Sequence, residues 1–199
     1  MIKRGFDLIV SGIALLVLSP VFAVIAILVK AESPGPALFR QRRVGRFGRP
    51  FTMHKFRTMR EGERAPVHAL TVGADPRITP FGGFLRRYKL DELPQLFDVF
   101  VGSMSLVGPR PEMSEYVQRY PEEVRNSILS VRPGITDPAS IEFRNESALL
   151  ATASDPERLY VEEILPRKLA SSTRYLGRRS LLSDIRLIFQ TLRASARSG

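Results

Sequence analysis

The 199-residue sequence contains no cysteine, which excludes disulfide bonds, cysteine-ligated zinc and thiol nucleophiles. Tryptophan is also absent, and the two histidines, His54 and His68, leave little room for a His-rich metal site or a Ser-His-Asp triad. There is no Walker A segment, GxGxxG, HExxH or Asp-x-Asp pair of the kind that metal-dependent glycosyltransferases use. The candidate chemistry therefore has to come from carboxylates and cations.

Positive charge is concentrated in the first third of the chain. The net charge is +10, and residues 1–60 carry 11 Lys or Arg against Asp7 and Glu32, a net charge of +9. A basic excess of this kind indicates a phosphate-bearing partner, which would be nucleic acid, anionic lipid or a phosphorylated substrate.

Residues 8–29 form an apolar run of 22 residues without a charge. As a straight helix this run would be ~33 Å long, about the thickness of the hydrocarbon core of a bilayer. It has no polar face of the kind that a surface helix of a soluble protein shows. The run therefore predicts insertion into a membrane, and it is too long for a typical cleaved signal peptide.

Ser19 and Pro20 lie near the centre of this run, where proline removes a backbone donor. Basic residues flank both ends, and basic flanks favour the cytoplasmic side. A re-entrant helix that enters, breaks at Ser19 and Pro20 and returns would place both flanks on that side. We favour this arrangement over a spanning helix with a tolerated kink.

The rest of the chain predicts a compact α+β domain that is mostly helical. Residues 34–60 indicate a short β-hairpin around a basic, glycine-rich turn, and residues 61–80 carry the turn residues of a loop. Apolar residues at helical spacing predict a helix from near Asp91 to Gly102. Further along we expect a Gly/Pro loop at 102–111, a helix at 112–130 interrupted near Pro121, an irregular stretch from Pro133, and helices at 156–170 and 180–195.

The last predicted helix is amphipathic, with Arg179, Arg186 and Arg193 opposite its apolar residues. Its apolar face either packs on the core or lies at the membrane interface, and the sequence favours neither alternative.

Asp91 and Glu92 are the strongest candidates for chemistry. These adjacent carboxylates fall at the start of a predicted helix, where free N–H groups and the helix dipole stabilise negative charge. They follow Arg86, Arg87 and Lys89, and such surroundings should keep Asp91 ionised, as a nucleophile attacking phosphorus requires. The alternative is structural, because Asp is a preferred helix cap and Glu is common in a first turn.

Four other cations are candidates for binding substrate phosphates. Arg110 stands in a stiff loop with a proline on each side, which suits bidentate phosphate binding or, equally, a structural salt bridge. Lys55, Arg57 and Arg132 show the same ambiguity when each is taken alone.

Taken together, these segments resemble the small monotopic bacterial phosphoglycosyl transferases, the bacterial sugar transferase family that starts glycan assembly on undecaprenyl phosphate. The matching blocks, in chain order, are KRGFDL at 3–8, SP at 19–20, KFRTM at 55–59, LDELPQL at 90–96, SLVGPRP at 105–111 and RPGIT at 132–136. Each block is weak alone, but six in order behind a broken apolar segment are specific.

The resemblance implies roles for the site residues. Asp91 matches the family's nucleophile, which takes the phosphosugar as a covalent acyl phosphate and releases UMP. Glu92 matches its partner, which is associated with the essential Mg²⁺, and both carboxylates are candidate ligands of that ion. Arg86 and Arg110 match basic residues that hold substrate phosphates or the nucleotide.

For the remaining blocks, the resemblance makes Ser19 and Pro20 the break of a re-entrant membrane helix. Lys55, Arg57 and Arg132 fall in basic blocks and are expected to contact substrate, with a less firmly implied role.

The family also implies an organisation and a set of partners. It divides the chain into a re-entrant membrane hairpin at 1–30 and a cytosolic catalytic domain at 31–199, monotopic on the cytoplasmic face of the bacterial inner membrane. A UDP-sugar, polyprenyl phosphate and membrane lipids are the implied partners. We expect no nucleic-acid partner, and a homodimer is compatible with the resemblance.

One stretch departs from the family pattern. Residues 137–146 read DPASIEFRNE and keep only the Arg144-Asn145 pair of a longer family motif, so the resemblance does not specify the sugar. Two other functions stay open at this point. One is a membrane-anchored protein that binds nucleic acid or anionic lipid through residues 40–60, for which steeply salt-dependent DNA binding would be the sign. The other is a non-catalytic scaffold, against which the intact Asp91-Glu92 pair argues.

Overall fold

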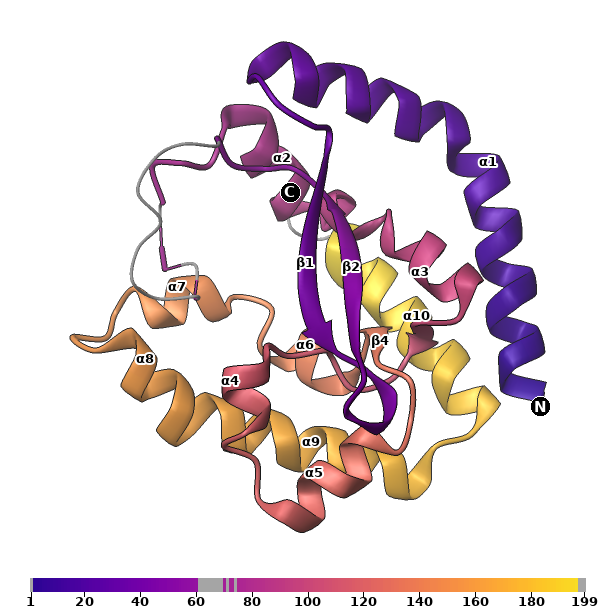
Figure 1. Cartoon of the computed structure of the whole chain (residues 1–199), viewed down its shortest axis with the longest axis vertical. Coiled ribbons are helices and arrows are strands. Elements are labelled where there is room, and N and C mark those ends of the chain that lie inside the picture. The colour runs from indigo at the N-terminus through magenta and orange to yellow at the C-terminus, as the bar shows by residue number, and fades with distance from the viewer. Residues whose placement is uncertain (1, 61–69, 71, 74, 197–199) are drawn as a thin grey trace.

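The computed structural model describes residues 2–60, 70, 72–73 and 75–196. A long N-terminal helix, α1 (Ile2–Glu32), lies along the outside of a domain of short helices around the β1–β2 hairpin (Figure 1). The remaining elements are β1 (Leu38–Val44), a turn at Arg46–Gly48, β2 (Pro50–Phe56), α2 (Pro80–Arg87), the 3₁₀ turn η2 (Leu90–Glu92), α3 (Gln95–Val101), β3 (Ser105–Val107), α4 (Ser114–Val117), α5 (Glu122–Leu129), β4 (Gly134–Thr136), α6 (Pro138–Glu142), α7 (Glu146–Leu150), α8 (Pro156–Leu159), the π-helix η3 (Tyr160–Ile164), α9 (Leu165–Arg178) and α10 (Leu181–Ala196). The predicted α+β class with mostly helical content is confirmed.

α1 continues as one helix through Ser19 and Pro20, where the sequence predicts a break. Proline inside a helix kinks it, and Figure 1 shows α1 changing direction in its middle. Pro20 cannot donate to the Leu16 carbonyl, and the Ser19 hydroxyl donates to that carbonyl instead at 2.8 Å. Among the described helices, α1 alone is long and apolar enough to cross a membrane.

The inner side of α1 is tied to the domain by polar contacts near its N-terminus. Asp7 is buried, and its carboxylate accepts from the Ser105 hydroxyl at 2.8 Å and from the Leu106 N–H at 3.2 Å. Arg4 donates to the carbonyls of Val99 at 2.6 Å and Phe100 at 2.9 Å. α1 is therefore positioned against α3 and β3, the elements that flank the candidate site. The rest of the domain leaves many large apolar residues of α1 exposed, among them Ile9, Ile13, Leu16, Val17, Val24 and Ile27.

The predicted hairpin is confirmed. β1 and β2 pair antiparallel, with Leu38 opposite Phe56 and Val44 opposite Pro50. The hairpin crosses the middle of the domain, and α3 packs against β2 (Figure 1).

α2 was not expected from the sequence, because two of its eight residues are glycines. Thr79 caps the helix by accepting from the Gly82 N–H at 3.0 Å, and Pro80 occupies the first turn. A Cβ at Gly82 would lie 2.3 Å from the Thr58 carbonyl oxygen, so this glycine permits a close approach of two backbones. Most of the predicted 61–80 loop lies outside the described residues, as does His68.

The C-terminal half forms the largest hydrophobic cluster, in which Tyr116, Leu150, Tyr160 and Ile164 are almost fully buried. The helix predicted at 112–130 is two helices, α4 and α5, separated around Pro121. The helices predicted at 156–170 and 180–195 are present as α8 to α9 and as α10.

Candidate active site

Glu92 lies at the centre of a buried group of charges. Lys55 from β2 donates to Glu92 Oε1 at 3.2 Å. Arg110 donates to both carboxylate oxygens, with its Nη1 3.2 Å from Oε2 and its Nη2 bonded to Oε1. Burial alone would raise the pKa of Glu92, but the charges of Arg110 and Lys55 outweigh it and hold that pKa well below its ordinary value. Glu92 is therefore a fixed anion that orients two cations.

Asp91 is also buried, and its carboxylate differs from that of Glu92 in its hydrogen bonding. Its Oδ1 atom is inaccessible to solvent and has no hydrogen-bond partner among the described residues. Burial raises the pKa of Asp91 and the Glu92 carboxylate adds to the shift, while Lys55, Lys89 and Arg86 oppose it. This direction is opposite to the sequence-based expectation, because burial outweighs cations that stand near Asp91 without bonding to Oδ1.

The local backbone also differs from the expected helix start. Asp91 and Glu92 lie in the 3₁₀ turn η2, and α3 begins only at Gln95. Lys89 adopts a left-handed conformation at φ 59°, which separates η2 from α2 and turns the chain. The two carboxylates are thus held by a tight turn between helices, and neither one caps α3.

Arg110 is brought to Glu92 by a pairing that the sequence does not reveal. β3 and β4 pair parallel, so that the SLVGPRP block at 105–111 meets the RPGIT block at 132–136. The Gly108 N–H donates to the Thr136 carbonyl at 3.0 Å, and the Gly134 N–H donates to the Pro109 carbonyl at 3.0 Å. A Cβ at Gly134 would lie 2.1 Å from the Gly108 nitrogen, so glycine is required where the two segments touch.

A second buried polar network holds the residues that follow Arg110. Arg43 from β1 donates to the Pro111 carbonyl at 3.3 Å and pairs with Glu112 Oε2 at 3.2 Å. The other carboxylate oxygen, Glu112 Oε1, accepts from the Tyr160 hydroxyl at 2.9 Å and from Lys168 Nζ at 3.4 Å. Although burial would raise it, the pKa of Glu112 is lowered by Lys168 and Arg43. This network fixes the loop that carries Arg110 against the hairpin and the C-terminal helices.

The structure brings together some of the predicted substrate-binding residues and not others. Lys55 and Arg110 meet at Glu92, and Arg86 in α2 is close enough for its charge to act on Asp91. Arg57 instead donates to the Ser33 carbonyl at 2.7 Å at the end of α1, and Arg132 donates to the Gly102 carbonyl at 2.7 Å. The known contacts of these last two side chains are structural.

Sequence reasoning missed several residues of this region: Arg43, Gln95, Glu112, Tyr160 and Lys168. Gln95 and Glu112 lie in or beside recognisable blocks, which was a usable signal. Tyr160 and Lys168 carry no local signal, because they reach Glu112 from more than 45 residues away along the chain.

The carboxylates suit a magnesium ion only in part. The described residues contain no group of three or more Asp, Glu or His side chains able to hold a metal. Mg²⁺ beside nucleotides usually takes one or two carboxylates and completes its shell with phosphate and water oxygens. Asp91 Oδ1 accepts no hydrogen bond from the described residues, so its lone pairs could bind the ion. Glu92 could use the lone pairs that do not accept from Lys55 and Arg110.

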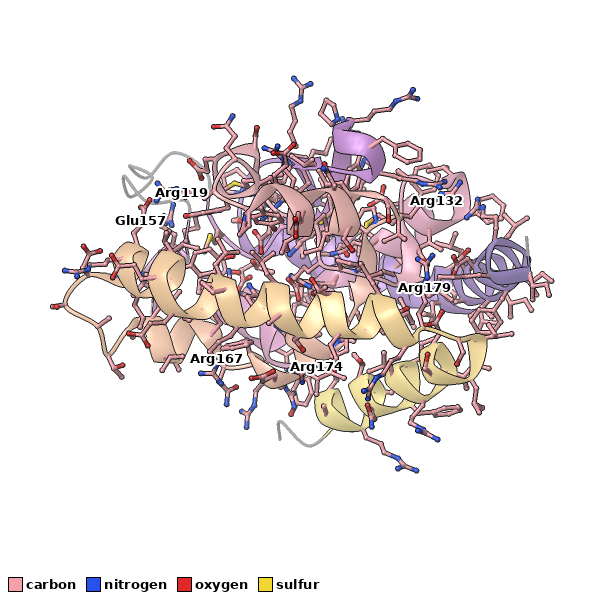
Figure 2. All side chains as sticks on the ribbon, turned by 90° about the horizontal axis from the view of Figure 1, so that it is seen from below. Arg119, Arg132, Glu157, Arg167, Arg174 and Arg179 are labelled. Atoms are coloured by element: carbon pink, nitrogen blue, oxygen red, sulfur yellow. The ribbon has the colours of Figure 1, made fainter. Side chains whose placement is uncertain are left out.

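A separate cavity of about 580 Å³ lies between α5 and α9. Figure 2 looks onto this face, where α9 crosses the view, with Arg119 and Glu157 toward the end away from α1. Arg119 and Arg174 are the charged residues among its otherwise largely apolar described lining, and none of those lining residues is acidic. Without a carboxylate this cavity lacks a nucleophile, so the chemistry is better placed at Asp91.

Comparison with known proteins adds independent information. A family model described as bacterial sugar transferase matches residues 1–198. The chain is 37% identical over 195 residues to the UDP-glucose:undecaprenyl-phosphate glucose-1-phosphate transferase of Escherichia coli (strain K12), a match that covers 96% of this chain and 39% of the relative. It is 35% identical over 194 residues to the UDP-N-acetylgalactosamine-undecaprenyl-phosphate N-acetylgalactosaminephosphotransferase of Aeromonas hydrophila, covering 96% and 43%.

A shorter relative matches over nearly its whole length. The exopolysaccharide production protein PSS of Rhizobium leguminosarum bv. phaseoli is 37% identical over 207 residues, covering 96% of this chain and 93% of that protein. The chain thus spans about two fifths of the first two relatives and almost all of the third.

Proposed function

Because this chain belongs to the bacterial sugar transferase family, we propose that it moves a phosphosugar from a UDP-sugar to polyprenyl phosphate. Two relatives are named as transferases that use UDP-glucose or UDP-N-acetylgalactosamine with undecaprenyl phosphate. Their sugars differ, so the family does not specify the sugar used here.

The observation that carries the proposal is the contrast between two adjacent carboxylates. Glu92 is held by Arg110 and Lys55, whereas Asp91 Oδ1 is buried and accepts no hydrogen bond. An oxygen with free lone pairs beside oriented cations is what attack on a phosphoryl group requires.

We propose two steps. In the first, Asp91 Oδ1 attacks the β-phosphorus of the UDP-sugar, the bond from that phosphorus to the bridging oxygen breaks, and UMP leaves with that oxygen. In the second, an oxygen of polyprenyl phosphate attacks the same phosphorus and releases the Asp91 carboxylate. Lys55, Arg86 and Arg110 would bind and orient the diphosphate oxygens through both steps.

We propose that Asp91 and Glu92 hold Mg²⁺ during the reaction. When bound, this ion would neutralise charge on the diphosphate. Arg110 and Lys55 meanwhile hold Glu92 in place, which leaves Asp91 the carboxylate with an oxygen that has no hydrogen-bond partner among the described residues.

We also propose a membrane arrangement that suits the same reaction. We propose that α1 enters the cytoplasmic face of the bacterial inner membrane and returns at the bend around Pro20, as a monotopic hairpin of residues 1–30. Residues 31–199 would then form the catalytic domain, at a level where both a lipid phosphate and a soluble nucleotide sugar can reach Asp91. The exposed apolar residues Leu182, Phe189 and Leu192 of α10 suit contact with the same interface. The homodimer remains a proposal of the same kind.

The covalent step provides the decisive test. Wild-type protein incubated with Mg²⁺ and a panel of UDP-sugars should gain the mass of one phosphosugar and release UMP. Asp91→Asn should form no adduct, whereas Asp155→Asn, at the exposed start of α8, should form it normally. Release of UDP without an adduct would favour direct glycosyl transfer and overturn the proposal.

A further inference from the structure

Gln95 is the first residue of α3 and is 1% exposed. Both polar atoms of its side chain, Oε1 and Nε2, are shielded from solvent and have no hydrogen-bond partner among the described residues. Buried amides are nearly always hydrogen-bonded, so an amide with neither atom satisfied needs a specific explanation.

The backbone places Gln95 four residues after the candidate nucleophile, at the point where η2 gives way to α3. From η2 through Leu93 and Pro94 the chain keeps right-handed helical angles, so Asp91 and Gln95 stand one turn apart. Asp91 Oδ1 is the other buried carboxyl or amide atom in this turn that lacks a partner.

We propose that the Gln95 amide binds hydroxyl groups of the sugar carried by the nucleotide donor. This inference rests on the proposed phosphosugar transfer and adds a sugar-binding residue to it. The sugar is attached to the phosphorus that Asp91 would attack, so it must lie within reach of the same helical turn.

The chemistry of the amide favours hydroxyls over the other groups of the reaction. Phosphoryl oxygens only accept hydrogen bonds, and Lys55 and Arg110 already present cations for them. A metal ion could take Oε1 but would leave Nε2 without an acceptor. Neighbouring sugar hydroxyls each donate and accept, so a pair of them satisfies both amide atoms at once.

Gln95→Met tests the assignment, because methionine keeps the length of the side chain and removes both polar atoms. Removing an unpartnered buried amide should leave the melting temperature unchanged or raise it. Activity should move the other way, with kcat/KM for the best UDP-sugar at least about tenfold lower, since a site that hydrogen-bonds a hydroxyl discriminates strongly by it. A melting temperature that falls together with activity would show a structural glutamine and overturn the inference.

Deoxy analogues of the best donor give the second readout. Wild type should react more slowly with the analogue that lacks the contacted hydroxyl, and Gln95→Met should treat that analogue and the parent sugar alike. Discrimination that persists unchanged at every hydroxyl, or a variant whose defect is a higher Mg²⁺ requirement, would contradict the assignment. Gln118→Met, an exposed glutamine after α4, should change neither stability nor discrimination.

The two proposals fail in distinguishable ways. If wild type forms no adduct with any UDP-sugar, the proposed function fails whatever Gln95 does. If wild type is active and Gln95→Met retains wild-type discrimination, only the assignment of Gln95 fails.

Discussion

Arg110 donates to both carboxylate oxygens of Glu92, across a gap of 18 residues in the chain. The pair is bidentate and mostly buried, so it fixes the direction of the guanidinium as well as its distance. Coulombic attraction to Glu92 raises the pKa of Arg110, which keeps the guanidinium charged at any relevant pH. A permanent, oriented cation bound to Glu92, the residue after Asp91, is the main electrostatic feature of the site.

Arg110→Lys should therefore not be a conservative change. A lysine cannot form the paired contact with Glu92, and loss of one hydrogen bond to a charged group costs about 1.5–3 kcal/mol, or roughly 10–100-fold in rate. The rate of adduct formation measures this effect. Arg119→Lys, in a partly exposed pair with Glu157 at 3.7 Å, is the matched control and should stay within about twofold.

The pH dependence of adduct formation should follow Asp91 on the acid side. Since burial raises the pKa of Asp91, its protonated form persists above the ordinary range near 3.9, and the rate should rise with pH until the carboxylate ionises. Burial lowers the pKa of Lys55. As the pH rises further, the rate should therefore decrease at a lower pH than the one at which an ordinary lysine loses its charge. A rate that already plateaus below about pH 4 would show an unshifted Asp91.

Gly134→Ala should disrupt the loop that carries Arg110. The new Cβ would meet the Gly108 nitrogen at 2.1 Å, where backbone has to move, and overpacking of this kind costs about 1–3 kcal/mol of unfolding free energy. Thermal unfolding and adduct formation should both suffer. Gly177→Ala in α9 provides the contrast, because its Cβ meets nothing within 4 Å and alanine should stabilise the helix by about 0.5–1 kcal/mol.

Tyr160→Phe tests the network behind Arg110. Removing the hydroxyl takes one donor from the buried Glu112 carboxylate, which should lower the free energy of unfolding by about 1.5–3 kcal/mol. Denaturant unfolding measures it, with Tyr88→Phe as the control because the Tyr88 hydroxyl makes no hydrogen bond within the described part of the chain. Equal stability of the two variants would mean that Arg43 and Lys168 satisfy Glu112 without Tyr160.

Local signals in the sequence were sufficient for the elements that depend on neighbouring residues. The β1–β2 hairpin, the end of α3 at Gly102 and the interruption around Pro121 all follow from alternation, glycine or proline. Asp91 and Glu92 could be singled out as a carboxylate pair for the same reason. Their exact setting was not predicted: the two carboxylates lie in a 3₁₀ turn after a left-handed Lys89, and α3 starts only at Gln95.

The features that the sequence did not predict depend on contacts between residues far apart in the chain. The parallel pairing of β3 with β4 joins segments about 30 residues apart, and no periodicity in either segment reveals it. The pKa of Asp91 was expected in the wrong direction because a sequence shows which cations are near in the chain but not how deeply the carboxylate is buried. Gln95 was overlooked because an unpartnered amide can be recognised only once its surroundings are known.

The buried carboxylate of Asp7 gives α1 a structural role in addition to its proposed attachment to the membrane. It receives hydrogen bonds from Ser105 and Leu106, a few residues ahead of Arg110. An unrelated helix of equal length and hydrophobicity could attach the domain to a bilayer. It would lack the Asp7 carboxylate that accepts hydrogen bonds from Ser105 and Leu106 of β3. α1 and the loop that carries Arg110 are therefore structurally coupled, and replacing α1 should perturb that loop even when the protein still attaches to a membrane.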